Sequence, residues 1–110
     1  MEHLVSNTGD VAEPVEGVRI TYLTAGDQMS AQHFEIDPGA VVPEHDHHHE
    51  QFGFVHEGEL TFFVDGTELV VEAGEGFAIP GGEPHAVENT GETVVRGIDL
   101  FSPPRSDDYW

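Results

Sequence analysis

The sequence contains no cysteine and no lysine, and its three arginines stand against 22 acidic residues. Without cysteine, disulfide scaffolds, thiolate metal ligands and cysteine nucleophiles are all excluded. The formal net charge of -19 at pH 7 repels nucleic acids and anionic membranes, so neither is an expected partner. No apolar stretch approaches the roughly 18 to 20 residues of a membrane span, and residues 1–16 lack the basic and apolar parts of a secretory signal. We therefore expect a cytoplasmic protein.

The acidic residues are spread among alternating apolar runs and are not gathered in one block. Dispersed charge of this kind is typical of a solvated acidic surface on a folded domain, whereas long blocks of like charge are typical of disorder. Such a surface resembles those of proteins from salt-loving organisms. Repulsion among the carboxylates opposes the compact state and salt screens it, so we predict that the protein unfolds at low salt.

The length of 110 residues suits one domain, which we expect to span residues 1–110 with an N-terminal arm over residues 1–16. No stretch shows sustained helical periodicity, and 13 glycines and seven prolines interrupt short apolar runs. Strands are predicted over residues 18–23, 29–36, 51–55, 60–64, 68–72, 76–79, 85–88 and 93–101. Asp65-Gly66 is a tight-turn signal. This pattern predicts an all-β, double-sheet jelly roll.

Two of the eight histidines, His45 and His47, are two residues apart. On an extended strand both imidazoles leave the same face and can converge on one divalent ion. In a hairpin, the amide oxygen of Gln51 on the next apolar run lies opposite this pair, and Glu50 takes its place if the register slips by one residue. His85 must then arrive from a strand distant in sequence. Three imidazoles and one amide oxygen suit one divalent transition ion such as Zn, Ni, Fe or Mn.

A competing interpretation is that residues 47–49, three consecutive histidines, form a polar loop that binds metal only adventitiously. The other histidines are assigned to background roles. His33 and His56 are interpreted as structural, His48 and His49 as loop residues beside the metal ligands, and His3 as exposed.

Two segments of the chain match the motifs of the cupin superfamily, which the chain resembles. The first motif is Gly, five residues, His-x-His, three or four residues, usually Glu, six residues and Gly, and here it comprises Gly39, His45, His47, Gln51 and Gly58. The second is Gly, five residues, Pro-x-Gly, two residues, His, three residues and Asn, and here it comprises Gly74, Pro80, Gly82, His85 and Asn89. The resemblance implies a double-stranded β-helix, or cupin jelly-roll barrel, with metal-binding motifs at residues 39–58 and 74–89.

One position departs from the first motif, because Gln51 stands where the superfamily usually has a glutamate ligand. An amide in place of a carboxylate leaves the metal centre one unit more positive, and hence a stronger Lewis acid toward anionic substrates. The more positive centre supports oxidised metal states less well, and an amide cannot act as a carboxylate base. Oxygenase chemistry is therefore the less favoured interpretation.

The C-terminal segment over residues 97–110 is expected to lie at the cavity mouth. If the last predicted strand continues, Asp99 and Phe101 share one face. Pro103-Pro104 then ends the strand and sets the direction in which Arg105 projects. A carboxylate, an aromatic ring and a guanidinium would line the entrance to the cavity.

This ending, together with the form of the first motif, resembles small pectin-degradation cupins that convert ring-closed 4,5-unsaturated uronates to linear keto forms. The resemblance implies metal ligands at His45, His47, Gln51 and His85. It also implies that Asp99 and Arg105 are the catalytic and substrate-binding residues and that Phe101 shapes the pocket.

Structural roles for the two charged residues remain as alternatives. Asp99 would then be a strand-end carboxylate paired with Arg105 or Arg96, and Arg105 would be the partner of Asp107 or Asp108.

Three classes of function follow: a metal-dependent enzyme that acts without redox change on a small sugar acid, a metal-dependent dioxygenase, and a non-catalytic cupin that binds a small anion or carbohydrate. Gln51 and the segment over residues 99–105 favour the first.

On the strand of Gln51, Phe52 and Phe54 point away from the cavity, and two phenylalanines on an outer face need cover. The second sheet and the N-terminal residues of the same chain are alternative covers, but for so small a barrel we expect a symmetric homodimer.

Overall fold

A computed structural model describes residues 1–3 and 11–105, and this part of the chain contains ten strands and no helix. The strands are β1 (Val11–Val15), β2 (Val18–Ala25), β3 (Ser30–Ile36), β4 (Val41–His45), β5 (Glu50–Glu57), β6 (Glu59–Val64), β7 (Thr67–Glu72), β8 (Gly76–Ile79), β9 (His85–Glu88) and β10 (Val95–Ser102). No helix among the described residues has the length and apolar character needed to cross a membrane.

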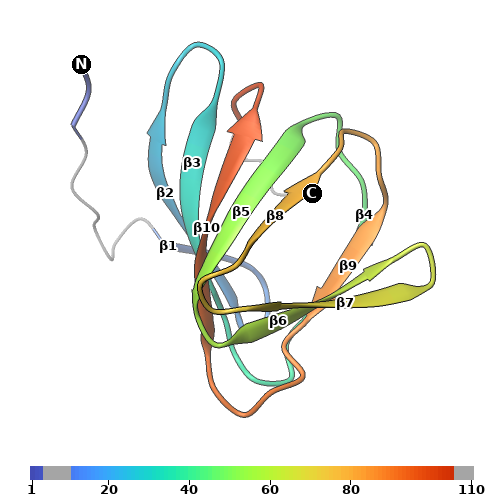
Figure 1. The fold of residues 1–110 in the computed structure, drawn as a ribbon. Helices are drawn as coiled ribbons and strands as arrows, with labels where there is room; N and C mark the ends of the chain where they lie inside the picture. Colours follow the sequence, from blue (N-terminus) through green and yellow to red (C-terminus); the bar gives the residue numbers. More distant parts are fainter. Residues whose placement is uncertain (4–10, 106–110) are drawn as a thin grey trace.

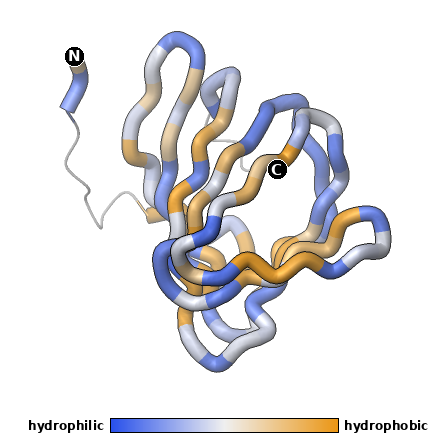
Figure 2. Tube along the Cα trace, in the orientation of Figure 1, coloured by the Kyte–Doolittle hydropathy of each residue, from blue (hydrophilic) through white to orange (hydrophobic). Residues whose placement is uncertain are grey.

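Two antiparallel sheets face one another, as Figure 1 shows. The larger sheet has the order β1-β2-β3-β10-β5-β8 and the smaller has the order β4-β9-β6-β7. Their inner faces enclose a core that includes Val18, Phe34, Ile36, Val55, Leu60, Phe62, Ile79 and Val95. In Figure 2 the apolar stretches run through the part of the molecule where the two sheets converge. The predicted all-β jelly roll is confirmed.

Strand β10 lies in the middle of the larger sheet and carries residues of the site. Its burial alternates strictly, with Val95, Gly97, Asp99 and Phe101 turned inward. Asp99 is flanked by Gln32 on β3 and by Gly53 on β5. The predicted common face of Asp99 and Phe101 is therefore present, because side chains two apart on a strand leave the same side.

The turns follow the sequence signals. Asp65 and Gly66 have φ values of 51° and 75° and join β6 to β7 as a two-residue loop, which is the geometry expected of a type I′ hairpin. The motif glycines Gly39, Gly58, Gly74 and Gly82 all have positive φ, between 80° and 91°. A residue with a Cβ would be strained at these turns.

The predicted hairpin between the histidine pair and Gln51 is wrong. Strand β4 pairs with β9 in the smaller sheet, whereas β5 pairs with β10 and β8 in the larger one. Strand β4 ends at His45, so His47 lies in the loop beyond it and the two histidines do not share a strand. The two motifs pair within each sheet, β4 with β9 and β5 with β8, and the turn between β4 and β5 crosses from one sheet to the other.

Strand β1 was not predicted, and β4 was expected only as the strand that carries His45 and His47, so its start at Val41 was missed; each contains a proline, Pro14 or Pro43. Both are edge strands of their sheets. Proline lacks the N–H that an interior strand needs for its ladder, so it is tolerated at edges and weakens the sequence signal for a strand.

The alternation on β5 agrees with the prediction. Gln51 and Val55 are buried, while Phe52 and Phe54 are 51% and 46% exposed on the outer face of the larger sheet. His56 is exposed on that face as well.

We expect the folded state to depend on salt. Arg19 forms ion pairs with Asp37 and Glu35, and Arg96 forms ion pairs with Glu35 and Glu57. These two guanidiniums neutralise part of the charge of three carboxylates, in a chain with 22 acidic residues. The Debye length falls from about 30 Å at 0.01 M salt to about 3 Å at 1 M, which screens the remaining repulsion. Thermal unfolding followed by circular dichroism should show a Tm at least about 10 °C higher in 2 M NaCl than in dilute buffer, corresponding to roughly 2 kcal/mol.

A non-ionic osmolyte at matched osmolarity is the control. It is excluded from the protein surface, as salt can be, but it does not screen charges. A Tm that is unchanged between dilute and molar salt, or that rises equally with the osmolyte, would contradict an electrostatic origin.

Candidate metal centre and cavity

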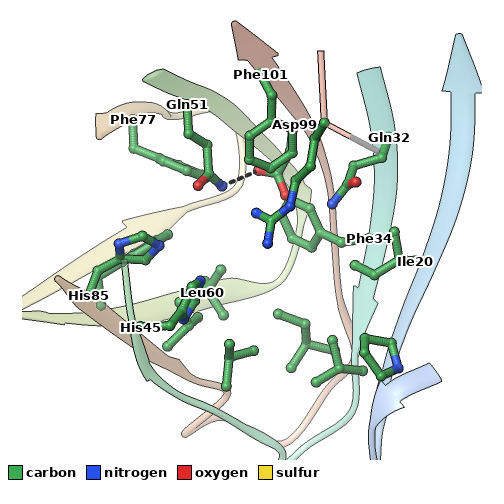
Figure 3. Close-up of a pocket in the computed structure, with 17 residues that line it drawn as sticks. Ile20, Gln32, Phe34, His45, Gln51, Leu60, Phe77, His85, Asp99 and Phe101 are labelled. Carbon is green, nitrogen blue, oxygen red and sulfur yellow. Dashed lines mark hydrogen bonds between the residues drawn. The ribbon is translucent and has the colours of Figure 1, made fainter. Parts of the chain in front are cut away.

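Two neighbouring histidines and a third from a distant part of the chain meet at one side of the barrel. His45 ends β4, His85 begins β9 and pairs with His45 in the ladder, and His47 lies in the loop that follows. One ring nitrogen from each lies within 4.8 Å of the others. Figure 3 shows His45 and His85 side by side at the edge of the cavity. The structure thus brings together the three imidazoles selected from the sequence.

Backbone carbonyls orient all three rings in the same way. The Nδ1 atoms of His45, His47 and His85 lie 2.9, 3.1 and 2.9 Å from the carbonyl oxygens of Pro43, His49 and Glu83. A carbonyl only accepts, so each Nδ1 carries the proton and each Nε2 keeps its lone pair. Burial is the main cause that lowers the pKa of each of the three histidines, which favours the neutral rings that bind metal.

The side chain of Gln51 completes this cluster. Its Nε2 donates to Asp99 Oδ1 at 3.0 Å, so its Oε1 faces His47 Nε2 at 3.1 Å. With Nδ1 of His47 protonated, both His47 Nε2 and Gln51 Oε1 are hydrogen-bond acceptors, so their lone pairs repel each other. A cation bound to both atoms would remove this repulsion. The donor set therefore fits a divalent transition ion. Glu50 is exposed on the opposite side of β5, so the structure turns Gln51, and not Glu50, toward the histidines.

The carboxylate of Asp99 is buried in the cavity, at 7% exposure. Burial raises its pKa to about 6, while hydrogen bonds from Gln51 and Gln32 and the charge of Arg105 act in the opposite direction. Arg96, one of the partners weighed for Asp99, lies on the outer face with Glu35 and Glu57.

Sequence reasoning missed Gln32, although the signal was present. Gln32 is an inward position of the alternating strand β3, directly beside Asp99 in the ladder. It lines the cavity with Asp99, as Figure 3 shows.

Arg105 and Phe101 lie together at the cavity. The guanidinium carbon of Arg105 is 5.0 Å from the ring centroid of Phe101, and its backbone N–H donates to Ser30 Oγ at 2.9 Å. Phe101 is 2% exposed and presents its ring edge-on to His47 and His49. The alternative partners Asp107 and Asp108 lie outside the described residues.

The loop of His47 is held by the second motif and by the C-terminal segment. Gly82 N–H donates to the His47 carbonyl at 2.7 Å, and a Cβ at Gly81 would collide with the His48 carbonyl. The ring of His49 lies against Phe101, with ring centroids 5.9 Å apart, which places the loop beside the end of β10.

The last residue of the second motif, Asn89, has a structural role. Its Nδ2 donates to the carbonyls of Ile36 and Thr93 at 2.9 and 2.8 Å, and its Oδ1 accepts from Gly91 N–H at 3.0 Å. The side chain thereby joins β3, β9 and the turn before β10 without contacting the cavity.

The cavity opens to solvent, and the space inside it that a water-sized sphere can occupy is about 80 Å³. The polar residues that line it come from both sheets and from the C-terminal segment, namely Gln32, His45, Gln51, His85, Asp99 and Arg105. The remainder is apolar and includes Ile20, Phe34, Val42, Leu60, Phe77 and Val87. Phe77 reaches inward over Gly53, where any side chain would collide with its ring. The size of this apolar part was not expected from the sequence.

A family model described as a cupin domain matches residues 32–101, which include every candidate site residue except Arg105. The tetracenomycin polyketide synthase protein TcmJ of Streptomyces glaucescens is 33% identical over 72 residues, and the chain spans only 48% of its length. The pectin degradation protein KdgF of Dickeya dadantii is 27% identical over 93 residues, which cover 84% of both chains. The structure of KdgF from a Halomonas species superposes with a TM-score of 0.80 at 28% identity, covering 92% of this chain and 91% of that one.

Proposed function

The chain belongs to the cupin domain family, and from this premise we propose that it is a metal-dependent enzyme that opens 4,5-unsaturated uronates to their linear keto forms without redox change. The observation that carries the proposal is the link from the histidine triad through Gln51 to the buried Asp99. The likeness to two KdgF proteins, one of them described as a pectin degradation protein, supports a sugar-acid substrate.

His45, His47, His85 and Gln51 would hold one divalent ion, with Zn, Ni, Fe and Mn all compatible with this donor set. When bound, such an ion supplies Lewis acidity and open coordination positions for substrate oxygens.

Asp99 is the proposed proton-transfer group. Ring opening breaks the bond between the ring oxygen and the anomeric carbon and leaves an aldehyde and an enol. A proton delivered to C4 and one lost from the enol oxygen give the ketone, so substrate and product are isomers. Asp99 lines the cavity, and its pKa of about 6 allows its carboxylate both to accept and to donate that proton near neutral pH. Hydrogen bonds from Gln51 and Gln32 orient the carboxylate.

Arg105 is the proposed clamp for the substrate carboxylate. A guanidinium can hold a carboxylate through two parallel hydrogen bonds. Its position over the Phe101 ring places the charge at the cavity, where it offsets the repulsion of an anionic substrate by the acidic surface.

Proton NMR of a 4,5-unsaturated galacturonate in high salt tests this function. We expect native protein to remove the vinyl proton signal faster than the spontaneous reaction, and Asp99→Asn to lower the rate by about 10²- to 10⁴-fold with the bound ion retained. Asparagine keeps the size of the side chain and an oxygen for the Gln51 amide, but it cannot shuttle the proton. Glu50→Gln, which removes a charge one residue from Gln51 on the outer side of β5, is the matched control and should leave the rate unchanged.

A native rate equal to the spontaneous one, with metal bound, would reject the uronate. Oxygen consumption in the same samples would then favour the dioxygenase class, and ligand binding without turnover would favour a binding module.

A second candidate function rests on the apolar part of the cavity. Sugar hydroxyls that face side chains such as Leu60 and Phe77 lose hydrogen bonds to water without replacement, which disfavours binding. An aromatic or polyketone acid would fill that space better, and TcmJ, a polyketide synthase protein, is among the relatives. Tighter binding of a hydroxyaromatic acid than of galacturonate by native protein would favour this candidate.

We also propose a homodimer formed through the outer face of the larger sheet. Phe52 and Phe54 are half exposed there, and the same face carries Arg19 and Arg96, two of the three arginines of the chain. Electrostatic repulsion between two strongly acidic copies of the chain is weakest when they associate through the face that carries these arginines. Sedimentation in molar salt should give the dimer mass, and Phe52→Glu should give the monomer.

A further inference from the structure

A second pair of histidines lies on the opposite side of the larger sheet from the cavity. His33 is on β3 and His56 is on β5, and β10 runs between these strands. The neighbours of His33 along the chain, Gln32 and Phe34, point inward, as does Val55 before His56, so both imidazoles emerge on the outer face. Rigid strands therefore fix the two rings relative to each other.

The two rings meet through their Nε2 atoms, which are 3.1 Å apart. The ring centroids are 5.3 Å apart with the planes at 43°, so the rings are tilted and not stacked. When two imidazoles bind one ion at adjacent positions with metal–nitrogen distances of about 2.0 to 2.1 Å, the two nitrogens are about 2.8 to 3.4 Å apart. The observed separation suits a chelated ion with little movement, and it suits an N–H···N hydrogen bond in its absence.

Charges around the pair are compatible with a cation. Burial, followed by the proximity of His56, lowers the pKa of His33, which favours its neutral form. Arg96 is the nearby positive group, and Glu35 and Glu57 pair with it from either side. The net charge of -19 draws divalent cations toward the surface in general.

We propose that His33 and His56 form a second site for a divalent transition ion of the class that prefers imidazole ligands, such as Zn²⁺, Ni²⁺ or Cu²⁺. In a single copy of the chain, the part-exposed position leaves the remaining coordination to water. An ion bound there joins β3 to β5 across β10, the strand that carries Asp99 on its inner face, and stabilises the sheet that holds this wall of the cavity. This site does not depend on the proposed function of the cavity.

Zn²⁺ titration of the full chain in 2 M NaCl tests the site, with calorimetry for stoichiometry and ring-nitrogen NMR for the ligands. High salt weakens loose attraction to surface carboxylates. Native protein should bind two ions, and the Nε2 resonances of His33 and His56 should shift with the second. His33→Gln and His56→Gln should each weaken the second ion by at least about tenfold and leave the first unchanged. His3→Gln, at an exposed histidine, is the matched control and should retain both.

His47→Ala, which alters only the cavity set, should lose the first ion and keep the second. Circular dichroism verifies that each variant is folded. If one of the two single variants fails to fold, the other still tests the site. A second ion that is indifferent to both His33→Gln and His56→Gln, or native protein that binds only one, would overturn the proposal.

Discussion

His47→Ala is expected to abolish tight binding of a divalent ion at the cavity and to reduce uronate opening to the spontaneous rate. His47 is held on both sides of its ring, with its Nδ1 at the His49 carbonyl and its Nε2 facing Gln51. Two imidazoles and an amide oxygen would remain, and loss of one strong ligand costs at least about 10- to 100-fold in affinity. Metal content after dialysis and the NMR assay for the vinyl proton give the two readouts.

His48→Ala is the matched control, since its side chain is exposed beside the same loop. It should keep both the ion and the rate. Chelation of native protein should reproduce the His47→Ala rate, and return of the ion should restore it. Retention of one cavity ion and of the native rate by His47→Ala would mean that the triad is not the metal centre.

Gly97→Ala is expected to produce the largest loss of stability from a single methyl group. Gly97 lies in the middle of β10, and a Cβ there would sit 2.5 Å from the Phe54 carbonyl oxygen and against the ring of Phe34. Neither can retreat easily, because the carbonyl belongs to the neighbouring strand β5 and Phe34 is buried in the core. Overpacking at such a site costs at least about 3 kcal/mol, or a fall in Tm of roughly 12 °C or more.

Thermal unfolding in 2 M NaCl, where the native protein is most stable, provides the measurement. Gly26→Ala is the matched control, since a Cβ at Gly26 meets nothing closer than 4.0 Å and its φ is not positive. It should change Tm by no more than about 2 °C. Equal melting of Gly97→Ala and native protein would show that β10 and β5 are not packed as described.

Local periodicity was sufficient to place much of the site. An even spacing puts Asp99 with Phe101, and Gln51 with Val55, on inner faces, because strand side chains alternate whatever their partners. The turns at Gly58 and Asp65-Gly66 were equally readable, since positive φ restricts the choice of residue.

Pairing between strands was not readable in the same way. The short loop after His45 suggested a hairpin with Gln51, yet β4 pairs with β9, some forty residues further on. Adjacent strands of a jelly roll can cross between sheets, and nothing in the loop itself distinguishes a crossing from a hairpin. Which strands pair with each other depends on how two whole sheets bury their apolar faces against one another.

From the sequence we predicted the all-β class, the cupin resemblance, the three histidines that meet and the acidic composition. These properties depend on residue type, short spacing and net charge, which are local or additive. Tertiary structure alone decided which strands meet, and with them the Gln32 contact to Asp99, the apolar part of the cavity and the His33–His56 pair. Each of these joins residues that are distant in the chain, and their proximity is set by the packing of two sheets around one core.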